Sequence, residues 1–350
     1  MKRKYIMAIL FTLLLLIVTA CSEGKETAKA GESKEKITLK VAVSQPVTHA
    51  MTVETFVPFM EKVTELTDGQ VEFDFYPAEQ LGKTGDIYGL TADGVTDLGI
   101  YMAPYYPDMM PLTNALLTMP GMYSTSYEGT MAYHELSKKS PLLESDFLNN
   151  GVRPVINYAV PVYEYWTTGK EIKVPEDLKG LKVRVSGDLA NKAMESLDAS
   201  PVNITVNEMY EALERGVIDS VGLYAGSMEG YGMGELVKYG TDGVSFGGTG
   251  VGLVINENVF QGLPKNVQEV IVELGDEFTE SNAKYFDEYN LEVIQEYKDA
   301  GINVYELTED EKAEWQKFYA GIEETFLKEQ TNPDIEKTIN DFKEAVKNNK

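Results

Sequence analysis

The sequence predicts an α/β protein with two domains, and three observations support this prediction. First, residues 37–75 read as a strand, an amphipathic helix and a second strand, which is the order of a βαβ unit. Second, a helix that ends at glycine is followed by a similar turn and strand twice, at residues 92–101 and 214–224. Third, 330 residues follow a predicted leader of 20, and this length exceeds what one hydrophobic core usually serves.

Residues 1–20 have the features of a secretory signal peptide. Basic residues at positions 2–4 precede an apolar stretch at 9–18, which is short for a membrane span, and small residues then lead to Cys21. Val18-Thr19-Ala20-Cys21 looks like the lipobox of bacterial lipoproteins, so we expect a protein lipidated at Cys21, for instance with palmitate, and anchored to the cell membrane. An uncleaved anchor is the alternative. Because Cys21 is the only cysteine, the chain has no internal disulfide.

Composition limits the partners. Residues 21–36 have almost no large apolar side chain and are predicted to form a flexible tether. Removal of residues 1–20 takes away three basic residues and no acidic one, so the net charge changes from −25 to −28. Nucleic-acid binding requires a basic surface, and we therefore expect no nucleic-acid partner.

The first predicted domain comprises residues 37–161 and 250–285. Its opening strand alternates apolar residues from Leu39 to Val43, and the helix that follows ends at Asp68-Gly69. We expect Pro58 to kink this helix, because proline removes a helical hydrogen bond. The other elements expected here are a turn at 118–121, a helix around 127–137, a strand at 152–158 interrupted by Pro154, and a returning strand at 251–255.

The second predicted domain comprises residues 162–249 and 286–348. Its expected elements are strands on either side of a turn at 175–180, a helix at 188–197, and helices whose first turns carry capping boxes at Thr205–Glu208 and Thr308–Glu311. A helical stretch that begins at Pro264 and runs to Ala300-Gly301 is about 50 Å long at 1.5 Å per residue, so we expect it to span more than one small domain.

The repeated connector has two interpretations. In both copies a Gly-Val-x-Asp turn leads into an apolar strand that ends at tyrosine, at Tyr101 and at Tyr224. It is either a common helix-to-strand link or one such link in each of two similar domains that face a shared cleft.

The sequence contains no complete motif of the enzyme classes that we considered. The run Gly243–Gly247 matches the pattern G-x-S-x-G, but that motif needs a histidine after the serine, and the only histidines are His49 and His134. Neither histidine has metal-ligand spacing, and the glycines at 247–252 form no phosphate-binding motif. We therefore expect no catalysis, no cofactor and no metal.

One arginine stands out. Strand residues 181–186 place Leu181, Val183 and Val185 on one face and Arg184 on the other. The chain has four arginines, and the planar fork of an arginine matches a carboxylate in two parallel hydrogen bonds. An arginine paired with a neighbouring acid is the simpler alternative.

The run PEDLKGLKVRV at 175–185, followed by a helix and MYEALERGVIDSV, closely resembles the solute-binding proteins of tripartite ATP-independent periplasmic (TRAP) transporters, of the DctP type. The segments DFYPAEQLGK, ADGVTDLGIY, LTMPG and VINENVFQGLP also match, and the resemblance extends from Ile37 to about Lys317. It implies a periplasmic-binding-protein-like fold with a central cleft and a long hinge-spanning helix. It also implies an extracytoplasmic receptor that captures a small carboxylate by cleft closure and then docks on TRAP membrane subunits.

The resemblance further implies that Arg184 forms a salt bridge with the carboxylate of the ligand. Many members carry a second arginine and an asparagine where this sequence has Glu164 and Leu223. Both departures remove partners for a second anionic group, which disfavours a dicarboxylate.

An acid and aromatic residues take those places and would suit an ammonium group through charge and cation–π attraction, so we expect a carboxylate or zwitterionic ligand. His49 is equally able to cap the following helix, and we expect Tyr163 to lie in the core. The complete set of predicted ligand-binding residues is Arg184, Glu164, Trp166, Tyr165, Tyr224, His49, Gln45, Gln80 and Tyr101.

Two other functional classes remain open. One is a secreted lipoprotein enzyme that has kept the same scaffold, which turnover of a bound compound would reveal. The other is a ligand-sensing surface protein, which a neighbouring sensor gene without transporter genes would favour.

Overall fold

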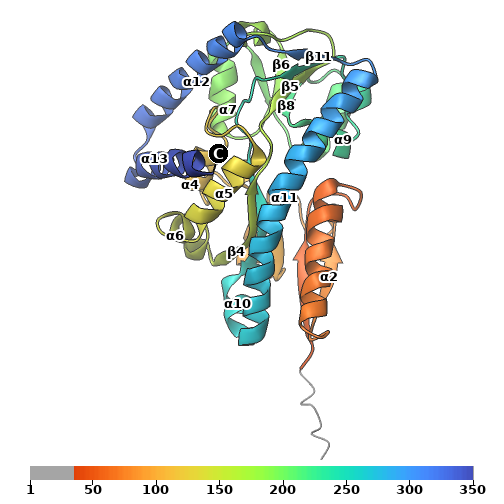
Figure 1. The fold of residues 1–350 in the computed structure, drawn as a ribbon, viewed down its shortest axis with the longest axis vertical. Helices are drawn as coiled ribbons and strands as arrows, with labels where there is room; N and C mark the ends of the chain where they lie inside the picture. Colours follow the sequence, from red (N-terminus) through yellow and green to blue (C-terminus); the bar gives the residue numbers. More distant parts are fainter. Residues whose placement is uncertain (1–34, 350) are drawn as a thin grey trace, which may run out of the picture. The chain divides into compact units, whose positions relative to one another are not determined.

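The computed structural model describes residues 35–349, which form two β-sheets with helices packed around them (Figure 1). The first sheet has the strand order β2-β1-β3-β10-β4. Strands β1, β2 and β3 are parallel, and β10 runs antiparallel to β3 and β4. Its strands are β1 (Ile37–Ala42), β2 (Val71–Tyr76), β3 (Leu98–Met102), β4 (Val152–Ala159) and β10 (Gly250–Asn256).

The second sheet has six strands in the order β11-β9-β5-β8-β6-β7. Strand β5 is antiparallel to β8 and β9, whereas β6 is parallel to both of its neighbours. Its strands are β5 (Glu164–Thr167), β6 (Lys182–Val185), β7 (Ser200–Asn203), β8 (Ser220–Leu223), β9 (Tyr239–Asp242) and β11 (Asn303–Glu306).

Twelve α-helices and several shorter helical turns complete the part of the chain that the structure describes. The helices are α2 (Val57–Leu66), α3 (Ile87–Ala92), α4 (Pro111–Leu117), α5 (Ser126–Ser137), α6 (Leu142–Asp146), α7 (Asp188–Ser196), α8 (Met209–Glu214), α9 (Ala225–Gly230), α10 (Glu257–Gly262), α11 (Lys265–Asp299), α12 (Glu309–Glu329) and α13 (Pro333–Asn348). The shorter turns are η1 (Met51–Phe56), η2 (Ala103–Tyr105), η3 (Leu148–Asn150), η4 (Pro175–Leu178), η5 (Val206–Glu208) and η6 (Gly234–Leu236).

The predicted βαβ unit is confirmed, since β1 and β2 are parallel and α2 lies between them in the chain. The predicted kink at Pro58 stays a prediction, but the turn before this residue is unusual. Residues Met51–Phe56 form a π-helical turn, and Pro58 stands in the first turn of α2 that follows it. The N–H of Val57, just before the proline, still donates to the Thr52 carbonyl, so the helical path is continuous from the π-helical turn into α2.

The repeated connector occurs once in each sheet with the same hydrogen bonds. Gly94 and Gly216 both have positive φ, +73° and +66°, which glycine adopts without strain. The Asp97 carboxylate accepts from the Lys40 N–H, and the Asp219 carboxylate accepts from the Lys182 N–H. The aspartate N–H groups donate back to the same two lysine carbonyls. The connectors are therefore structurally equivalent.

Three segments join the two sheets. Residues 160–163 lead from β4 to β5, and residues 243–249 lead from β9 to β10. These two segments hydrogen-bond to each other, because the Tyr163 N–H donates to the Gly247 carbonyl at 2.8 Å and the Phe246 N–H donates to the Tyr163 carbonyl at 2.9 Å. We call them the crossover segments.

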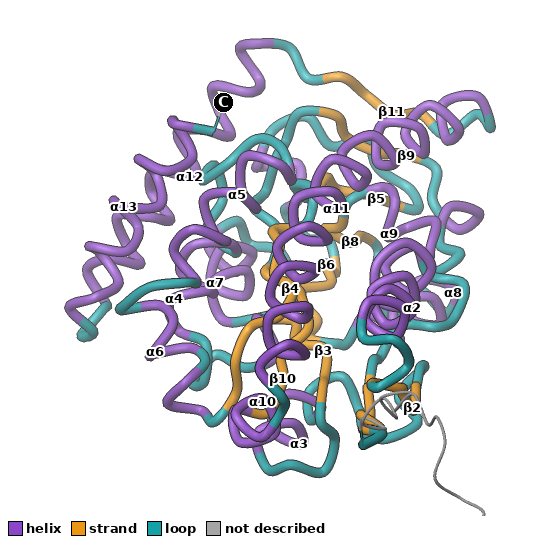
Figure 2. Tube along the Cα trace, turned by 60° about the horizontal axis from the view of Figure 1, so that its bottom comes forward, coloured by secondary structure: helices purple, strands orange, loops and turns teal. Residues whose placement is uncertain are grey.

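The third connection is α11, a helix of 35 residues. It packs against α2, α5 and β4 beside the first sheet and against α9 and β11 beside the second (Figures 1 and 2). The predicted α/β fold with a long hinge-spanning helix is confirmed. The predicted domain boundaries stay a prediction, and α13 packs against α4 and α5.

Candidate functional site

The site is organised around the guanidinium of Arg184 on β6. Val183 and Val185 point into the core, and the side chain of Arg184 between them is only 4% exposed. Its Nε donates to the Ile204 carbonyl at 3.0 Å, and its Nη2 donates to the Tyr105 hydroxyl at 2.9 Å. Among the described residues, no carboxylate lies within ion-pair distance of it. A buried cation without a counter-charge is unfavourable, so this position favours an anionic ligand.

Tyr105 connects the two sheets at this point. It belongs to η2, directly after β3 of the first sheet, and its hydroxyl accepts from Arg184 and from the Val206 N–H at 3.1 Å. Both partners belong to the second-sheet side. The Tyr105 hydroxyl therefore helps to hold the two sides together over Arg184.

A cavity of about 40 Å³ adjoins Arg184 and receives walls from both sheets and from the crossover segments. Arg184 is the only Lys, Arg, Asp or Glu among the described residues that line it. The other walls are mainly apolar and aromatic, as in most small-molecule sites, but the volume is far below the usual range of roughly 300–1,000 Å³, so an aromatic acid would enter only if the two sides part. The residues used below are Met102, Tyr105, Tyr163, Tyr165, Phe246 and Thr249, and we call this cavity the arginine pocket.

Tyr165 forms one wall of the arginine pocket, so the structure brings it together with Arg184. Its ring packs against Phe246 at a centroid distance of 5.6 Å and stacks on Trp315 at 5.8 Å. Tyr163, which we expected in the core, lines the same pocket and is half-buried. Burial raises the pKa of Tyr163, whereas the nearby Arg184 charge lowers it.

Glu164 has a different environment from the one we expected. Its carboxylate is buried and accepts four hydrogen bonds, from the Thr241 hydroxyl at 2.6 Å and from the N–H groups of residues 243–245 at 3.1 Å each. Burial raises the pKa of Glu164, whereas these donors lower it. The carboxylate thus holds one crossover segment and is not among the residues that line the arginine pocket.

Trp166 also faces away from the pocket. Alternation along β5 places it on the same side as Glu164, where its Nε1 donates to the Leu223 carbonyl at 2.8 Å. Its ring meets Tyr297 of α11 edge to face at 5.3 Å. Trp166 therefore packs in the core between β5 and α11 and does not contact the arginine pocket.

Tyr224 belongs to a set of buried hydroxyls without hydrogen-bond partners. Within the described residues the hydroxyls of Tyr158, Tyr224 and Tyr231 form no hydrogen bond of ordinary length, although Ser227 is close enough to lower the pKa of Tyr224 and Gln45 that of Tyr231; we call these three the tyrosine cluster. Burial raises the pKa of Tyr224, and the hydroxyls of Tyr158, Tyr163 and Tyr231 raise it further. Burial also raises the pKa of Tyr231, and Arg184 opposes this shift. None of the three lines the arginine pocket, although the Arg184 charge acts on Tyr231.

His49 lies where the two sides of the molecule meet. Its Nδ1 accepts from the Met51 N–H at 3.1 Å, although Ala50 is the N-cap residue of η1, and its Nε2 has no partner among the described residues. The imidazole packs against Tyr231 at a centroid distance of 5.1 Å. It also touches Gly230, where an added Cβ would lie 2.8 Å from the His49 ring. Burial lowers the pKa of His49 to about 4.

The three other predicted residues do not line the arginine pocket. Gln45 is buried behind Met102, to whose sulfur its amide donates at 3.6 Å. Gln80 is exposed in the turn after β2. Tyr101 is fully buried, and its hydroxyl is 3.1 Å from the Tyr133 hydroxyl of α5.

Sequence reasoning missed Tyr105, Phe246, Met102 and Thr249. Tyr105 follows β3 directly, and the ends of strands were the signal that selected Gln45 and Tyr101. Phe246 lies in the glycine-rich run that we considered only as a nucleophile elbow. Their approach to Arg184 depends on contacts between distant parts of the chain, which periodicity does not reveal.

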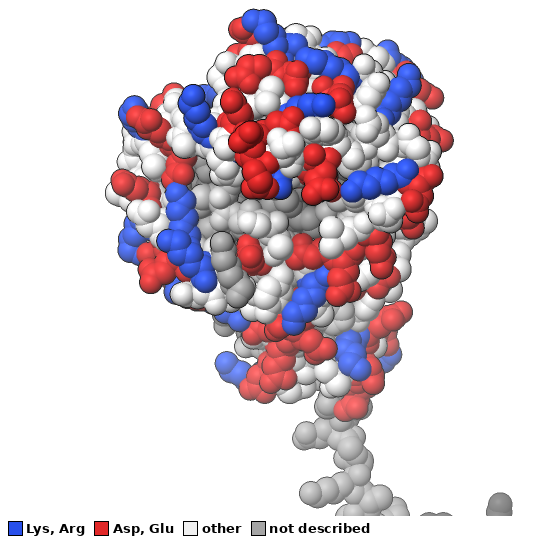
Figure 3. All heavy atoms as spheres, turned by 45° about the horizontal axis from the view of Figure 1, so that its top comes forward, with Lys and Arg blue, Asp and Glu red and all other residues white. Residues whose placement is uncertain are grey.

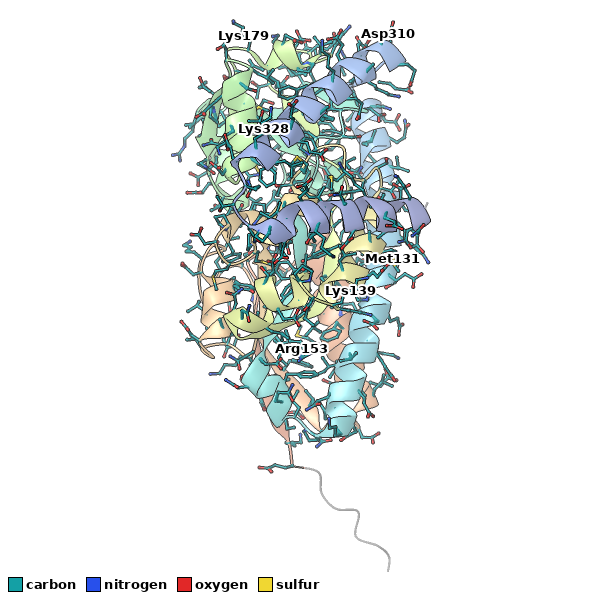
Figure 4. The ribbon with its side chains drawn as sticks, turned by 90° about the vertical axis from the view of Figure 1, so that its left-hand side faces the viewer. Met131, Lys139, Arg153, Lys179, Asp310 and Lys328 are labelled. Carbon is teal, nitrogen blue, oxygen red and sulfur yellow. The ribbon has the colours of Figure 1, made fainter. Side chains whose placement is uncertain are left out.

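Arg153 and Arg215 do not take part in the site. Arg153 forms a two-bond pair with Glu257 at 2.7–2.8 Å, and in Figure 4 it lies in the lower part of the molecule, away from Lys179 at the top. Arg215 is exposed beside Glu211. Cys21 lies outside the described residues.

Of the helices within residues 35–349, none combines the length and apolar character needed to cross a membrane. The same part of the chain holds no group of three or more His, Cys, Asp or Glu residues placed for a metal ion. Acidic and basic side chains alternate over the face shown in Figure 3, around a paler middle.

Two β-sheets flanked by helices meet at a buried arginine and a mainly apolar pocket. This arrangement is typical of a ligand-binding protein. The chain belongs to the DctP family, described as bacterial extracellular solute-binding protein, family 7, whose model matches residues 43–330. The family is one of solute-binding proteins, and the fold of this chain matches that of TRAP solute-binding proteins of solved structure.

Individual relatives are similar over most of the chain. The C4-dicarboxylate-binding periplasmic protein DctP of Rhodobacter capsulatus is 25% identical over 270 residues, which cover 74% of this chain and 77% of that protein. A TRAP solute-binding protein from a marine metagenome, solved with 3-hydroxybenzoate, has a TM-score of 0.83 and 24% identity and covers 90% of this chain and 99% of its own. A TRAP solute-binding protein of Bordetella bronchiseptica, solved with mandelate, has a TM-score of 0.80 and 23% identity, with coverages of 89% and 99%.

Proposed function

We propose that this protein captures a small monocarboxylate with an apolar or aromatic body, and that Arg184 binds its carboxylate. The observation that supports this most is the Arg184 guanidinium, buried at 4% exposure with no acidic partner among the described residues. A carboxylate would supply the missing charge through charge-assisted hydrogen bonds. The Tyr163, Tyr165 and Phe246 side chains would contact the rest of the ligand.

A single carboxylate fits this pocket better than two. Glu164 and Leu223 stand at the positions where many family members carry an arginine and an asparagine, and both side chains are buried. The arginine pocket offers no second cation among its described lining residues. The 3-hydroxybenzoate and mandelate proteins, which have similar folds, support an aromatic monocarboxylate, whereas the named dicarboxylate-binding relative does not.

The zwitterionic alternative depended on Glu164, and we do not retain it. The Glu164 carboxylate already accepts four hydrogen bonds, which leaves little capacity for an ammonium group. The unpaired hydroxyls of the tyrosine cluster are instead suited to oxygen atoms of the ligand, because a buried polar group gains from any partner.

Ligand binding would be coupled to closure of the two sides. Arg184 and Tyr165 belong to the second sheet, Met102 and Tyr105 come from the first, and a ligand between them favours the state in which both sides contact it. The crossover segments and α11 are the connections about which this movement would occur. The closed receptor would then dock on TRAP membrane subunits, with the mature protein anchored outside the cytoplasm through lipidated Cys21.

Mass spectrometry of small molecules released from the purified protein tests the ligand class. Calorimetric titration should follow with a panel of benzoate, mandelate, succinate and an amino acid. We expect a monocarboxylate among the released compounds and binding of at least one aromatic monocarboxylate. Tight binding of succinate or of the amino acid, with no response to monocarboxylates, would overturn the proposal.

A further inference from the structure

Tyr105 combines two properties among the described residues: it lines the arginine pocket and forms a hydrogen bond with the Arg184 side chain. It is the last residue of η2, so it reaches Arg184 from the first-sheet side. The turn that carries it is well held, because the Tyr106 N–H and the Asn114 side chain both donate to the Ala103 carbonyl, at 2.9 and 2.8 Å. The Tyr105 hydroxyl is therefore presented from an ordered backbone.

The oxygen of the Tyr105 hydroxyl accepts two hydrogen bonds. Arg184 Nη2 donates to it at 2.9 Å, and the Val206 N–H donates to it at 3.1 Å. A guanidinium and a backbone N–H are donors only, so the direction of both bonds is certain. Because a hydroxyl has two lone pairs and one hydrogen, the protein uses the whole acceptor capacity of this group.

The hydrogen of the Tyr105 hydroxyl, by contrast, has no acceptor among residues 35–349. The neighbouring Tyr106 shows the completed arrangement, since its hydroxyl accepts from the Tyr88 N–H at 3.2 Å and donates to the Thr84 carbonyl. The Tyr105 side chain is half-buried and lacks the second kind of bond. The acceptor for its hydrogen therefore comes from solvent or from a ligand.

Arg184 has unused donors beside this hydroxyl. Of the five N–H groups of its guanidinium, one on Nε and one on Nη2 bond to described residues, which leaves three without an acceptor there. The Tyr105 oxygen is 2.9 Å from Nη2, so the unused donors of the two side chains are close together. A carboxylate has two oxygens with about four acceptor positions and suits such a set of donors.

We propose that Tyr105 is a ligand-binding residue whose hydroxyl donates its hydrogen to an oxygen of the acid held by Arg184. This inference rests on the proposed function and adds a residue of the first-sheet side to the group that binds the ligand. It also adds selectivity, because an ammonium group has only hydrogens to offer and would meet only donors at this position.

The contact would couple ligand binding to closure. Arg184 and Val206 belong to the second-sheet side and Tyr105 to the first, so the hydroxyl completes all three of its bonds only when the two sides meet on the ligand. A ligand that supplies the third bond favours this state over one in which the sides are apart.

A crystal structure of the protein with benzoate or mandelate, whichever binds more tightly, tests the contact directly. We expect a ligand oxygen about 2.5–3.0 Å from the Tyr105 hydroxyl oxygen, with the bonds from Arg184 and Val206 retained. A ligand bound to Arg184 whose oxygens all lie beyond hydrogen-bonding distance of Tyr105 would overturn this inference and leave the proposed function intact. Failure of every monocarboxylate to bind would overturn both.

Calorimetric titration of Tyr105→Phe measures the effect of the hydroxyl on affinity. We expect the affinity for the same ligand to fall about tenfold or more. Tyr106→Phe is the matched control, because the Tyr106 hydroxyl bonds to Tyr88 and Thr84 and does not line the arginine pocket. It should lower stability and leave affinity unchanged. Wild-type affinity in a folded Tyr105→Phe protein would contradict the inference.

Val206→Pro separates the ligand contact from the bond between the two sides. It removes the Val206 N–H and leaves the Tyr105 hydroxyl in place. Val206 is the first residue of η5, where proline is tolerated, and Thr205 before it already has the extended ψ of 163° that a following proline favours. We expect this variant to lose clearly less affinity than Tyr105→Phe. Equal losses would show that Tyr105 only joins the two sides, and would overturn its assignment to the ligand.

Discussion

Arg184 is the residue whose environment is hardest to explain without a ligand, because its guanidinium is buried and has no acidic partner among the described residues. Its two hydrogen bonds, to the Ile204 carbonyl and the Tyr105 hydroxyl, orient the side chain but supply no negative charge. Burial of an ion costs several kcal/mol unless a partner compensates it. The anionic ligand that we propose would supply the missing negative charge.

Arg184 could be selected from the sequence, because strand alternation separates it from Val183 and Val185. Glu164 could not be interpreted in the same way. Its four donors come from residues 241–245, about 80 positions further along the chain, and local patterns carry no information on that contact. The resemblance located the position, and only the tertiary structure shows what the carboxylate binds.

The hydroxyl of Tyr224 offers a test at this scale. A buried hydroxyl without a partner destabilises the folded state, so Tyr224→Phe should leave the free energy of unfolding unchanged or raise it by about 1 kcal/mol. We also expect the variant to bind an oxygen-bearing monocarboxylate such as mandelate about fivefold to tenfold more weakly. Urea unfolding and calorimetry measure the two effects.

Tyr133→Phe is the matched control for that experiment. The Tyr133 hydroxyl is equally buried but lies 3.1 Å from both the Tyr101 and the Thr113 hydroxyls, so its removal should lower stability and spare binding. Lower stability with unchanged affinity in Tyr224→Phe would show that this hydroxyl serves the fold and not the ligand.

Among the elements, the crossover segments are central to the proposed movement. They pair through Tyr163, Phe246 and Gly247, and Glu164 binds the N–H groups at the start of the second segment. The same segments supply Tyr163 and Phe246 to the arginine pocket. A single short region thus connects the sheets and lines the site.

Glu164→Gln tests the assignment of this carboxylate to the crossover segment. An amide presents an NH₂ group where the backbone offers only donors, so we expect a loss of roughly 1–3 kcal/mol in the free energy of unfolding. Urea denaturation measures it, and Glu195→Gln on the exposed face of α7 should change nothing. If stability were unaffected while binding of an amine-bearing ligand disappeared, Glu164 would be a ligand contact after all.

The sequence predicted the regular elements well where the signal was local. The Thr308–Glu311 capping box forms with both bonds, at Thr205 only the Glu208 carboxylate accepts from the Thr205 N–H, and α11 begins directly after Pro264 as expected. The π-helical turn before α2 was not predictable from the apolar pattern, since a single wider turn shifts that pattern very little. The pairing of the crossover segments likewise lacks a local signal.

For the molecule as a whole, the closure that we propose would depend on contacts between the two sides. Tyr105 reaches Arg184 and Val206, and His49 packs against Gly230 and Tyr231. The second contact is buried and uncharged, because burial lowers the pKa of His49 from 6.5 to about 4. Protonation of His49 would therefore oppose the closed state.

The pH dependence of ligand affinity follows from this lowered pKa. Above pH 6.5 the imidazole is neutral whether or not it is buried. Between pH 6.5 and 4, a form with His49 exposed binds a proton that the closed form does not. As the pH is lowered from 6.5 to 4, we expect the affinity for a monocarboxylate to fall by up to about tenfold per pH unit. The His49→Gln variant should show a flatter dependence of affinity on pH.

His134→Gln is the control for the pH experiment. Burial also lowers the pKa of His134, but this residue pairs with Asp276 and lies near Asn157, within the first-sheet side. Ligand affinity is a better readout than the free energy of unfolding. Burial raises the pKa of Asp146 to about 6, so protonation of Asp146 stabilises the folded state as the pH falls, which opposes the effect of His49. Equal flattening by both histidine variants would remove His49 from the closure contact.

The central claim is tested most directly by calorimetric titration of Arg184→Ala with the monocarboxylate that the wild-type protein binds most tightly. We expect affinity to fall tenfold or more, since charge-assisted hydrogen bonds contribute roughly 1.5–3 kcal/mol. Arg215→Ala, which removes an exposed arginine, should bind like the wild type, and the melting temperature of Arg184→Ala should not fall. Wild-type affinity in a folded Arg184→Ala protein would contradict the account.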